Sequence, residues 1–177
     1  KGSCVAFLES ILTCAGYRVG TYTSPHLVQY NERIRVNNVN IDDQSLCEAF
    51  EHVDQARGDI SITYFEFGTL AALDIFNQAN LDIVILETGM GGRLDAVNII
   101  DADVALITSI GIDHTDWLGS DRETIALEKA GIMRTGKPAI YGDLDPTLSL
   151  IKYARENEVP LSLVARDFHY GLSDDDW

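Results

Sequence analysis

The chain has 177 residues, of which 46% are apolar and 23% charged; these proportions fit one globular domain and exclude a disordered segment. The net charge of −15 disfavours a nucleic-acid backbone or an anionic membrane surface as the main partner, but leaves room for a small anionic ligand. No apolar run reaches the roughly 18 residues that cross a membrane, and no secretory signal is visible. Three cysteines without a C-x-x-C pair are typical of reduced thiols in a cytoplasmic protein.

The chain opens with Lys1-Gly2-Ser3, directly before a helical pattern that ends near Gly16. No Met and no cap residue precede this helix, so we expect an N-terminal segment to be missing. Lys-Gly-Ser before a helix is the closing half of a P-loop, in which backbone N–H groups and the lysine hold phosphate and the hydroxyl reaches Mg²⁺. Three residues also match by accident at a chain terminus, and the motif alone leaves both interpretations open.

The elements expected up to Asn80 are a strand, a hairpin and two helices. The strand covers 18–23, and the hairpin strands 32–36 and 39–41 flank Asn37-Asn38, because Asn tolerates positive φ. Asp42 or Asp43 is expected to cap a helix that runs to about Arg57. A capping box at 63–66 opens the next helix, which runs to about Ala79.

Beyond Asn80, strands and helices alternate regularly. The strands are expected at 82–86, 104–108, 138–141 and 160–164, and the helices at 146–157 and from a capping box at Ser120-x-x-Glu123 to about Arg134. The runs 82–86 and 104–108 are continuously apolar, which is typical of strands buried on both faces. The fold class is therefore α/β, a three-layer P-loop-type domain with a mainly parallel sheet that contains both runs, truncated at both ends.

Polar residues follow three of the expected strands, where a parallel sheet places its ligands. Ser24 and Pro25 follow the first strand, and the alternative there is an ordinary turn. Glu87 follows a buried strand and is a candidate ligand for a divalent metal. His114 follows the next strand and is expected at the same edge of the sheet, although an isolated His is often structural.

The glycine-rich segment after Glu87 allows close approach of the backbone to a ligand, and Arg93 can bind an anionic group with two hydrogen bonds. The alternative is a glycine-rich loop with a surface ion pair. Lys129 lies beside the apolar stripe of Ile125, Ile132 and Met133, and a buried lysine tends to lose its proton. The alternative for Lys129 is a solvated helix lysine. Aromatic residues at the start of the helix after Thr63 either stack on a planar ligand or belong to the core.

Taken in chain order, six segments resemble those of the bifunctional bacterial dihydrofolate synthases/folylpolyglutamate synthases, a family within the Mur ligase superfamily. The segments are Lys-Gly-Ser, Tyr-Thr-Ser-Pro-His-Leu, Thr-Tyr-Phe-Glu-Phe, Glu-Thr-Gly-Met-Gly-Gly-Arg-Leu-Asp-Ala-Val-Asn, Ser-Ile-Gly-Ile-Asp-His-Thr-Asp-Trp-Leu-Gly and Glu-Lys-Ala-Gly-Ile. The resemblance runs from Lys1 to about Tyr170. It implies that residues 1–177 are part of the central ATP-binding domain of an ATP-dependent amide ligase.

The resemblance also implies the reaction and the residues that serve it. A ligase of this family adds L-glutamate to dihydropteroate or to the γ-carboxylate of folates through an acyl phosphate, with ATP and two Mg²⁺ sites. The carried-over roles are Lys1, Gly2 and Ser3 for ATP; Ser3, Ser24, Glu87, His114 and Lys129 for metal, with Lys129 carbamylated; Lys1, His114 and Lys129 for catalysis; and Thr63, Tyr64, Phe65, Arg93 and Asp95 for the folate substrate.

The chain departs from this family in what it lacks. The first half of the P-loop, the end of the ATPase domain and the C-terminal glutamate-ligase domain are absent, so we expect the fragment alone to be inactive. The alternatives are a Mur-type ligase of a cell-wall precursor, a non-catalytic nucleotide-binding domain, and a metal-dependent hydrolase built on a carbamylated lysine. For the whole protein we expect small-molecule substrates, neither nucleic acid nor membrane as partner, a monomeric state and a cytoplasmic location.

Overall fold

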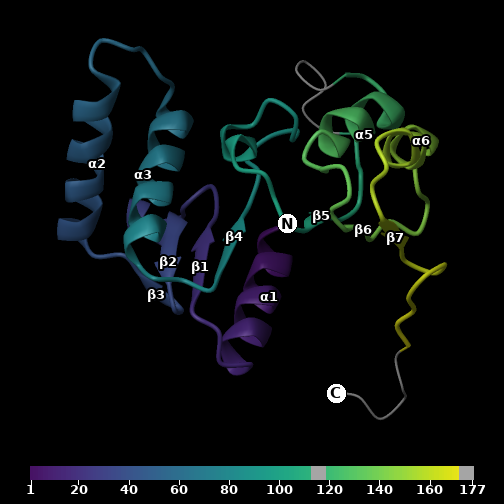
Figure 1. The fold of residues 1–177 in the computed structure, drawn as a ribbon, viewed down its shortest axis with the longest axis horizontal. Coiled ribbons are helices and arrows are strands. Elements are labelled where there is room, and N and C mark those ends of the chain that lie inside the picture. Colours follow the sequence, from purple (N-terminus) through teal and green to yellow (C-terminus); the bar gives the residue numbers. More distant parts are fainter. Residues whose placement is uncertain (113–118, 172–177) are drawn as a thin grey trace. The chain divides into compact units, whose positions relative to one another are not determined.

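Two β-sheets organise the chain, one in each of two units (Figure 1). The computed structural model describes residues 1–112 and 119–171, and it divides the chain into unit 1, Lys1–Gly89, and unit 2, Met90–Trp177. Each unit combines a sheet with α-helices, so the predicted α/β class is confirmed.

The sheet of unit 1 has the strand order β3-β2-β1-β4. Its strands are β1 (Val19–Tyr22), β2 (Ile34–Val36), β3 (Val39–Asn40) and β4 (Ile83–Leu86). Strand β1 pairs parallel with β4 and antiparallel with β2, and β2 and β3 form the predicted hairpin. The turn residues Asn37 and Asn38 have φ of 51° and 66°, which confirms the turn that Asn-Asn predicts.

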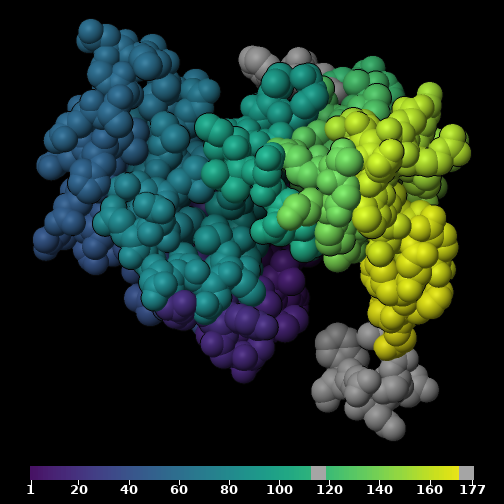
Figure 2. All heavy atoms as spheres, viewed as in Figure 1, coloured from purple at the N-terminus to yellow at the C-terminus, as the bar shows by residue number. Residues whose placement is uncertain are grey.

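Side-chain alternation along β1 places helices on both faces of the sheet of unit 1. Tyr22 faces helix α3 (Tyr64–Gln78), where its ring stacks on Phe65 and its hydroxyl lies 3.5 Å from Oγ1 of Thr69. Thr21 points to the opposite face and donates to Glu9 of helix α1 (Gly2–Cys14). Helix α2 (Asp43–Arg57) packs on α3 as an outer layer, drawn in blue in Figure 2.

The helix caps of unit 1 follow the local sequence. The Asp42 carboxylate accepts from the N–H of Ser45 and begins α2, and the Thr63 hydroxyl accepts from the N–H of Glu66 and begins α3. Glu66 accepts in return from the N–H of Thr63, which completes the predicted capping box. Helix α1 ends before Gly16, whose φ is +91°.

The sheet of unit 2 is parallel throughout, in the order β5-β6-β7. Its strands are β5 (Ala105–Ile107), β6 (Ala139–Tyr141) and β7 (Leu161–Leu163), and its helices are α5 (Arg122–Ala130) and α6 (Leu148–Glu156). Helices α5 and α6 pack on each other (Figure 1). Their buried side chains join those of the strands in one core. The described residues also form two short 3₁₀ helices, η1 (Tyr30–Arg33) in unit 1 and η2 (Ala96–Ile99) in unit 2.

The prediction that 82–86 and 104–108 lie in one sheet is wrong, because β4 belongs to the four-stranded sheet and β5 to the three-stranded one. The segment between the two strands contains the short helix η2 and no α-helix, whereas neighbouring parallel strands are usually joined by a helical crossover. The two runs are also less buried than their continuous apolar pattern predicts, since Val84 is 41% and Leu106 37% exposed.

The predicted cap at Ser120 is also wrong. Helix α5 is capped by Asp121, whose carboxylate accepts from the N–H and the hydroxyl of Thr124. Glu123 does not close a capping box but accepts from the N–H groups of Leu148 and Ser149, at the start of α6. These contacts with Ser149 lower the pKa of Glu123. Helix α6 thus receives its N-terminal cap from a neighbouring helix, and α5 ends at Ala130, before the predicted Arg134.

No helix in the described parts of the chain is long and apolar enough to cross a membrane.

The buried ion pair that joins α1 to the sheet should matter for stability. Glu9 is 3% exposed and pairs with Arg35 of β2. We expect Glu9→Gln to lower the free energy of unfolding by about 1–3 kcal/mol, because it leaves a half-buried guanidinium without its counter-charge. The control is Asp82→Asn, which breaks a solvent-screened pair with Arg18 and should cost clearly less than Glu9→Gln. Equal losses for the two variants in urea unfolding would contradict this interpretation of Glu9.

Candidate functional site

The parallel pairing of β1 and β4 brings Ser24 and Glu87 together. Tyr22 lies opposite Leu86 in the register, and the N–H of Glu87 donates to the carbonyl of Tyr22 at 2.9 Å. Two residues after Tyr22, the backbone N–H of Ser24 donates to Oε2 of Glu87 at 3.2 Å. Ser24 and Glu87 therefore lie together at the C-terminal ends of neighbouring strands, as predicted, and the contact comes from the backbone of Ser24.

Glu87 has the surroundings of a cation ligand. Its side chain belongs to a residue that is only 7% exposed, and no Lys, Arg or His among the described residues forms an ion pair with it. A buried carboxylate without a counter-charge is costly, so the site favours a bound cation. Within residues 1–112 and 119–171 no cluster of three or more His, Cys, Asp or Glu forms a complete metal site.

Lys1 lies at the same loop as Glu87. Its Nζ donates to the carbonyl oxygens of Thr88 at 2.6 Å and Gly89 at 3.2 Å. Lys1 is also the N-cap residue of α1, so Lys1, Gly2 and Ser3 stand at the exposed N-terminus of a 13-residue helix. A helix N-terminus with unsatisfied N–H groups and a lysine attracts phosphate. Their predicted role in holding ATP stays a prediction.

The three residues predicted to line a folate pocket point to different neighbours. Phe65 packs against Gly89, where a Cβ atom would lie 2.9 Å from the phenyl ring, so the loop after Glu87 rests on this ring. Tyr64 is 65% exposed and makes an edge contact with the ring of Tyr30. The Thr63 hydroxyl is engaged in the capping box. Phe65 therefore packs against the loop that follows Glu87, at the rim formed by Ser24, Glu87 and Lys1. Tyr64 instead belongs to a separate aromatic group with Tyr30.

In unit 2, the glycine-rich loop is anchored to helix α5. The guanidinium of Arg93 donates through Nε and Nη2 to Oε1 of Glu128, at 3.1 and 2.9 Å. A Cβ on Gly92 would lie 2.8 Å from the carbonyl of Glu128 and 3.1 Å from Cα of Lys129, so only glycine allows this approach. The loop-and-ion-pair alternative for Arg93 thus describes the contact that the structure shows.

Asp95 closes the same loop on itself. One carboxylate oxygen accepts from the N–H of Met90 at 2.9 Å, and the other accepts from the N–H of Val97 at 3.1 Å and caps η2. Both carboxylate oxygens of Asp95 therefore already accept a backbone N–H. A substrate that binds Asp95 would have to share these oxygens with the two N–H groups.

Lys129 lies in the last turn of α5 and is half-buried, between the buried residues Ala126 and Ala130. Ile125 is 1% and Met133 4% exposed, so the apolar stripe that the sequence predicts beside Lys129 is present. His114 lies outside the described residues.

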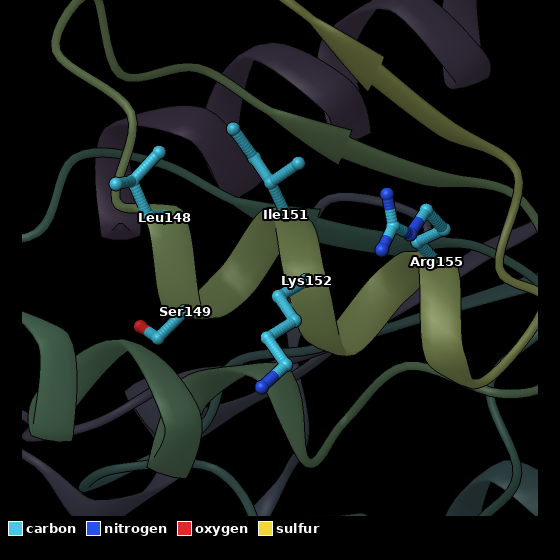
Figure 3. A pocket seen from close by; sticks show the side chains of 5 residues that line it. All are labelled: Leu148, Ser149, Ile151, Lys152 and Arg155. Carbon is cyan, nitrogen blue, oxygen red and sulfur yellow. The ribbon is translucent and has the colours of Figure 1, made fainter.

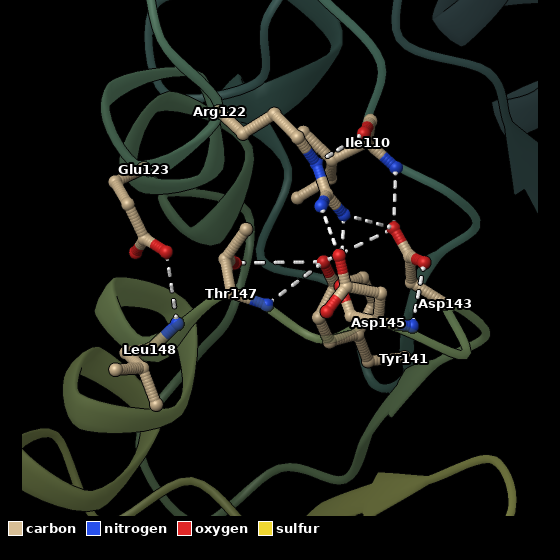
Figure 4. A network of polar contacts seen from close by, with 8 residues as sticks. All are labelled: Ile110, Arg122, Glu123, Tyr141, Asp143, Asp145, Thr147 and Leu148. Carbon is tan, nitrogen blue, oxygen red and sulfur yellow. Dashed lines mark hydrogen bonds and ion pairs between the residues drawn. The ribbon is translucent and has the colours of Figure 1, made fainter.

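The sequence analysis missed a polar network at the C-terminal end of the sheet of unit 2 (Figure 4). Arg122 donates to Asp143 at 3.0 Å and to Asp145 at 2.5 Å, and its Nε donates to the carbonyl of Ile110. Asp143 accepts in turn from the N–H of Ile110 at 2.9 Å. Burial would raise the pKa of Asp143, but the donors from Ile110, Asp145 and Arg122 outweigh it and the pKa is lowered.

Asp143 was detectable in principle. It follows the strand at 138–141 as Glu87 follows β4, so the rule for strand ends applies to it as well. The network fixes both backbone groups of Ile110, at the C-terminal side of β5.

A shallow pocket of about 350 Å³ lies on α6 (Figure 3). It is lined by Leu148, Ser149, Ile151, Lys152 and Arg155. None of the predicted site residues lines it, and we do not assign it to the candidate site.

Comparison with known proteins identifies the family. The family described as Mur ligase middle domain matches residues 29–167. The chain belongs to the Mur ligase middle domain family. It is 53% identical over 177 residues to the dihydrofolate synthase/folylpolyglutamate synthase of Escherichia coli K12, and it covers 42% of that protein. It is 41% identical over 165 residues to the protein of that description in Bacillus subtilis, covering 88% of this chain and 38% of that protein.

Solved structures agree with this assignment. E. coli FolC in complex with DHPP and ADP superposes with a TM-score of 0.94 at 54% identity, over 96% of this chain and 41% of that one. The Yersinia pestis bifunctional folylpolyglutamate synthase/dihydrofolate synthase, complexed with AMPPNP and Mn ion, gives 0.92 at 51% identity, over 96% and 42%. The chain thus spans about two fifths of the length of these relatives.

The close approach at Gly92 makes a testable prediction. We expect Gly92→Ala to lower the free energy of unfolding by about 1–3 kcal/mol, because the new methyl group would meet the backbone of Glu128 and Lys129. The control is Gly111→Ala, whose methyl group would meet no atom of residues 1–112 and 119–171 within 4 Å and should change stability by less than about 0.5 kcal/mol. Urea unfolding measures both, and a stable Gly92→Ala protein would show that the loop moves away from α5 at no cost.

Proposed function

We propose that this chain belongs to a longer protein, of its relatives' length, which we call the full-length ligase. The full-length ligase uses ATP to join L-glutamate to dihydropteroate, to the γ-carboxylate of folates, or to both. The observation that carries this proposal is the rim where Ser24, Glu87 and Lys1 gather, in a chain 53% identical to a dihydrofolate synthase/folylpolyglutamate synthase. We further propose that residues 1–177 belong to its ATP-binding domain and that a glutamate-ligase domain completes the site.

The residues of unit 1 suit nucleotide and a divalent metal. Relatives of this chain have been solved with ADP, and with AMPPNP and Mn ion. In this chain, the N-terminus of α1 with Lys1, Gly2 and Ser3 provides donors for the phosphates of ATP. Glu87, Ser24 and Ser3 offer oxygen ligands of the kind that Mg²⁺ prefers, and the bound ion would neutralise charge on the phosphates.

The proposed reaction proceeds in two steps. The substrate carboxylate attacks the γ-phosphorus of ATP, the bond from that phosphorus to the bridging oxygen breaks, and ADP leaves with the electron pair. The amine of L-glutamate then attacks the acyl phosphate, loses a proton, and phosphate leaves as the amide forms. Lys1 supports the first step because its ammonium is held in place by the carbonyl oxygens of Thr88 and Gly89. From this fixed position, its positive charge would stabilise the negative charge on the transferring phosphoryl group.

The remaining roles stay proposals. We assign Lys129, as its carbamate, and His114 to a second Mg²⁺ site with Glu87, and we assign Thr63, Tyr64, Phe65, Arg93 and Asp95 to the folate substrate. Phe65 is the best supported of these, because its ring lies against the loop that follows Glu87. We also place the protein in the cytoplasm as a monomer; its three cysteines are free, and two of them are exposed.

The decisive experiment is an ADP-release assay of the full-length ligase with dihydropteroate and with tetrahydrofolate, each with L-glutamate. We expect glutamate-dependent ADP release with at least one of the two. Glu87→Ala should lower kcat at least about 10²-fold, because it removes a preorganised charge at the transferring phosphoryl group. The matched control is Glu48→Ala on the outer helix α2, which should keep wild-type activity. Activity only with a cell-wall precursor, or an active Glu87→Ala protein, would contradict the proposal.

Lys129 provides a separate test. Arginine keeps the positive charge but cannot form a carbamate, so we expect Lys129→Arg to abolish ligation. Lys129→Ala should be equally inactive and partly rescued by added short carboxylates, which replace the lost oxygen ligand. The control for local damage is Leu127→Ala in the same helix, which truncates a 45% exposed side chain and should keep wild-type activity. An active Lys129→Arg protein would contradict the carbamate assignment and show that Lys129 is an ordinary helix lysine.

A further inference from the structure

Arg33 is a buried cation without an acidic partner. The residue is 8% exposed, and no carboxylate of the described residues lies within ion-pair distance of its guanidinium. The contrast with other arginines is clear, because most of those in the described parts of the chain pair with Asp or Glu: Arg18, Arg35, Arg57, Arg93, Arg122, Arg134 and Arg166. In a chain of net charge −15, a buried arginine left without an acid indicates that another anion takes that place.

Neutral groups hold the guanidinium in position. Its Nε donates to Nδ1 of His26 at 2.8 Å, and its Cζ lies 5.2 Å from the ring centre of Tyr30 and 5.6 Å from that of Tyr64. Burial raises the pKa of Tyr30 to about 12, so the phenol is neutral and is not the missing counter-ion. Because arginine can only donate, Nδ1 of His26 is the acceptor and its ring hydrogen is on Nε2.

The ends of this group remain accessible. The Nη atoms of Arg33 and Nε2 of His26 have no hydrogen-bond partner among residues 1–112 and 119–171. They are also not among the buried polar atoms that lack a partner, so each of them is accessible to solvent. Solvent therefore reaches the N–H donors at the ends of both side chains, while the contact between Nε of Arg33 and Nδ1 of His26 keeps the two groups in place. The adjacent ring of Tyr64 is 65% exposed and offers a flat apolar face.

The group stands next to the candidate site. The carbonyl of Arg33 accepts from the N–H of Thr23 at 2.8 Å, which extends the pairing of β1 and β2 by one residue. Thr23 is followed directly by Ser24, whose N–H donates to Glu87. The backbone of Arg33 and the carboxylate of Glu87 thus contact adjacent residues, so an extended substrate with its reacting group at Glu87 can meet the guanidinium with another part of its structure.

We propose that Arg33 and His26 bind a carboxylate of the substrate that does not react, namely the α-carboxylate on the glutamate of a folate. This inference rests on the proposed function and extends it to the choice between substrates. A cation paired with the reacting carboxylate would reduce its nucleophilicity toward ATP, so a spectator carboxylate is the better partner. Folates carry such a group beside the reacting γ-carboxylate, whereas the single carboxylate of dihydropteroate is the one that reacts.

The test compares the two substrates in the full-length ligase. We expect Arg33→Met to raise KM for tetrahydrofolate at least about tenfold with little change in kcat, since it removes a charge-assisted hydrogen bond made equally in ground and transition states. KM for dihydropteroate, ATP and L-glutamate should stay within about twofold. Arg33→Lys, which keeps the charge and loses the planar fork, should raise KM for tetrahydrofolate by less.

The control is Arg18→Met, which removes an exposed arginine at the opposite end of β1 and should leave every KM unchanged. A calorimetric comparison of folate and pteroate binding on the same proteins gives a readout that does not need turnover. Arg33→Met should weaken folate binding and spare pteroate binding. If Arg33→Met does not fold, Arg33→Lys carries both comparisons.

Several outcomes would overturn the inference. Equal rises for both substrates, a rise confined to L-glutamate or ATP, or unchanged folate binding would each show that Arg33 serves another anion or none. The proposed function fails in a different way, through a wild-type ligase that uses neither pterin substrate, while the binding comparison still decides the role of Arg33.

Discussion

The parallel register of β1 and β4 is the constraint on which the candidate site depends. It places Tyr22 opposite Leu86, and these two residues are the last pair of the β1–β4 ladder. Glu87 is thereby held beside the N–H of Ser24, although 62 residues separate the two in the sequence. The Glu9–Arg35 pair on one face and the Tyr22–Phe65 stack on the other fix β2 and β1 between helices α1 and α3, and the ladder from β1 to β4 then holds the carboxylate in position.

Charge is distributed unevenly over this acidic chain. Most arginines of the described residues are used to pair structural carboxylates, and several of these pairs join segments distant in the sequence, such as Arg122 with Asp143. The cations left for an anionic ligand are then few and individually placed, Lys1 at the start of α1 and Arg33 beside β1. A protein with a net charge of −15 that binds phosphates and carboxylates must use such local groups, because its overall field repels them.

Local signals predicted most elements, and long-range contacts were the ones missed. Thr63, Asp42 and Asn37-Asn38 act on backbone groups within a few residues, so their sequence alone identifies the two helix starts and the turn. Ser120 was the wrong cap because Asp121, one residue later, accepts from Thr124 and begins the helix, and because the Glu123 carboxylate is used by α6. Sheet membership of β4 and β5, and the burial of Arg33, depend on packing that no local pattern records.

The glycine-rich loop shows how one motif serves structure and site together. In unit 1, Gly89 lets the chain pass over the ring of Phe65 directly after Glu87; in unit 2, Gly92 lets it pass over the backbone of α5 near Lys129. Asp95 then fixes the loop through two backbone donors. A sequence rich in glycine next to a carboxylate at the end of a strand is usually interpreted as a place for a ligand to approach. Here the approaching groups are the protein's own, so the glycines are needed to hold the residues around the site before any ligand binds.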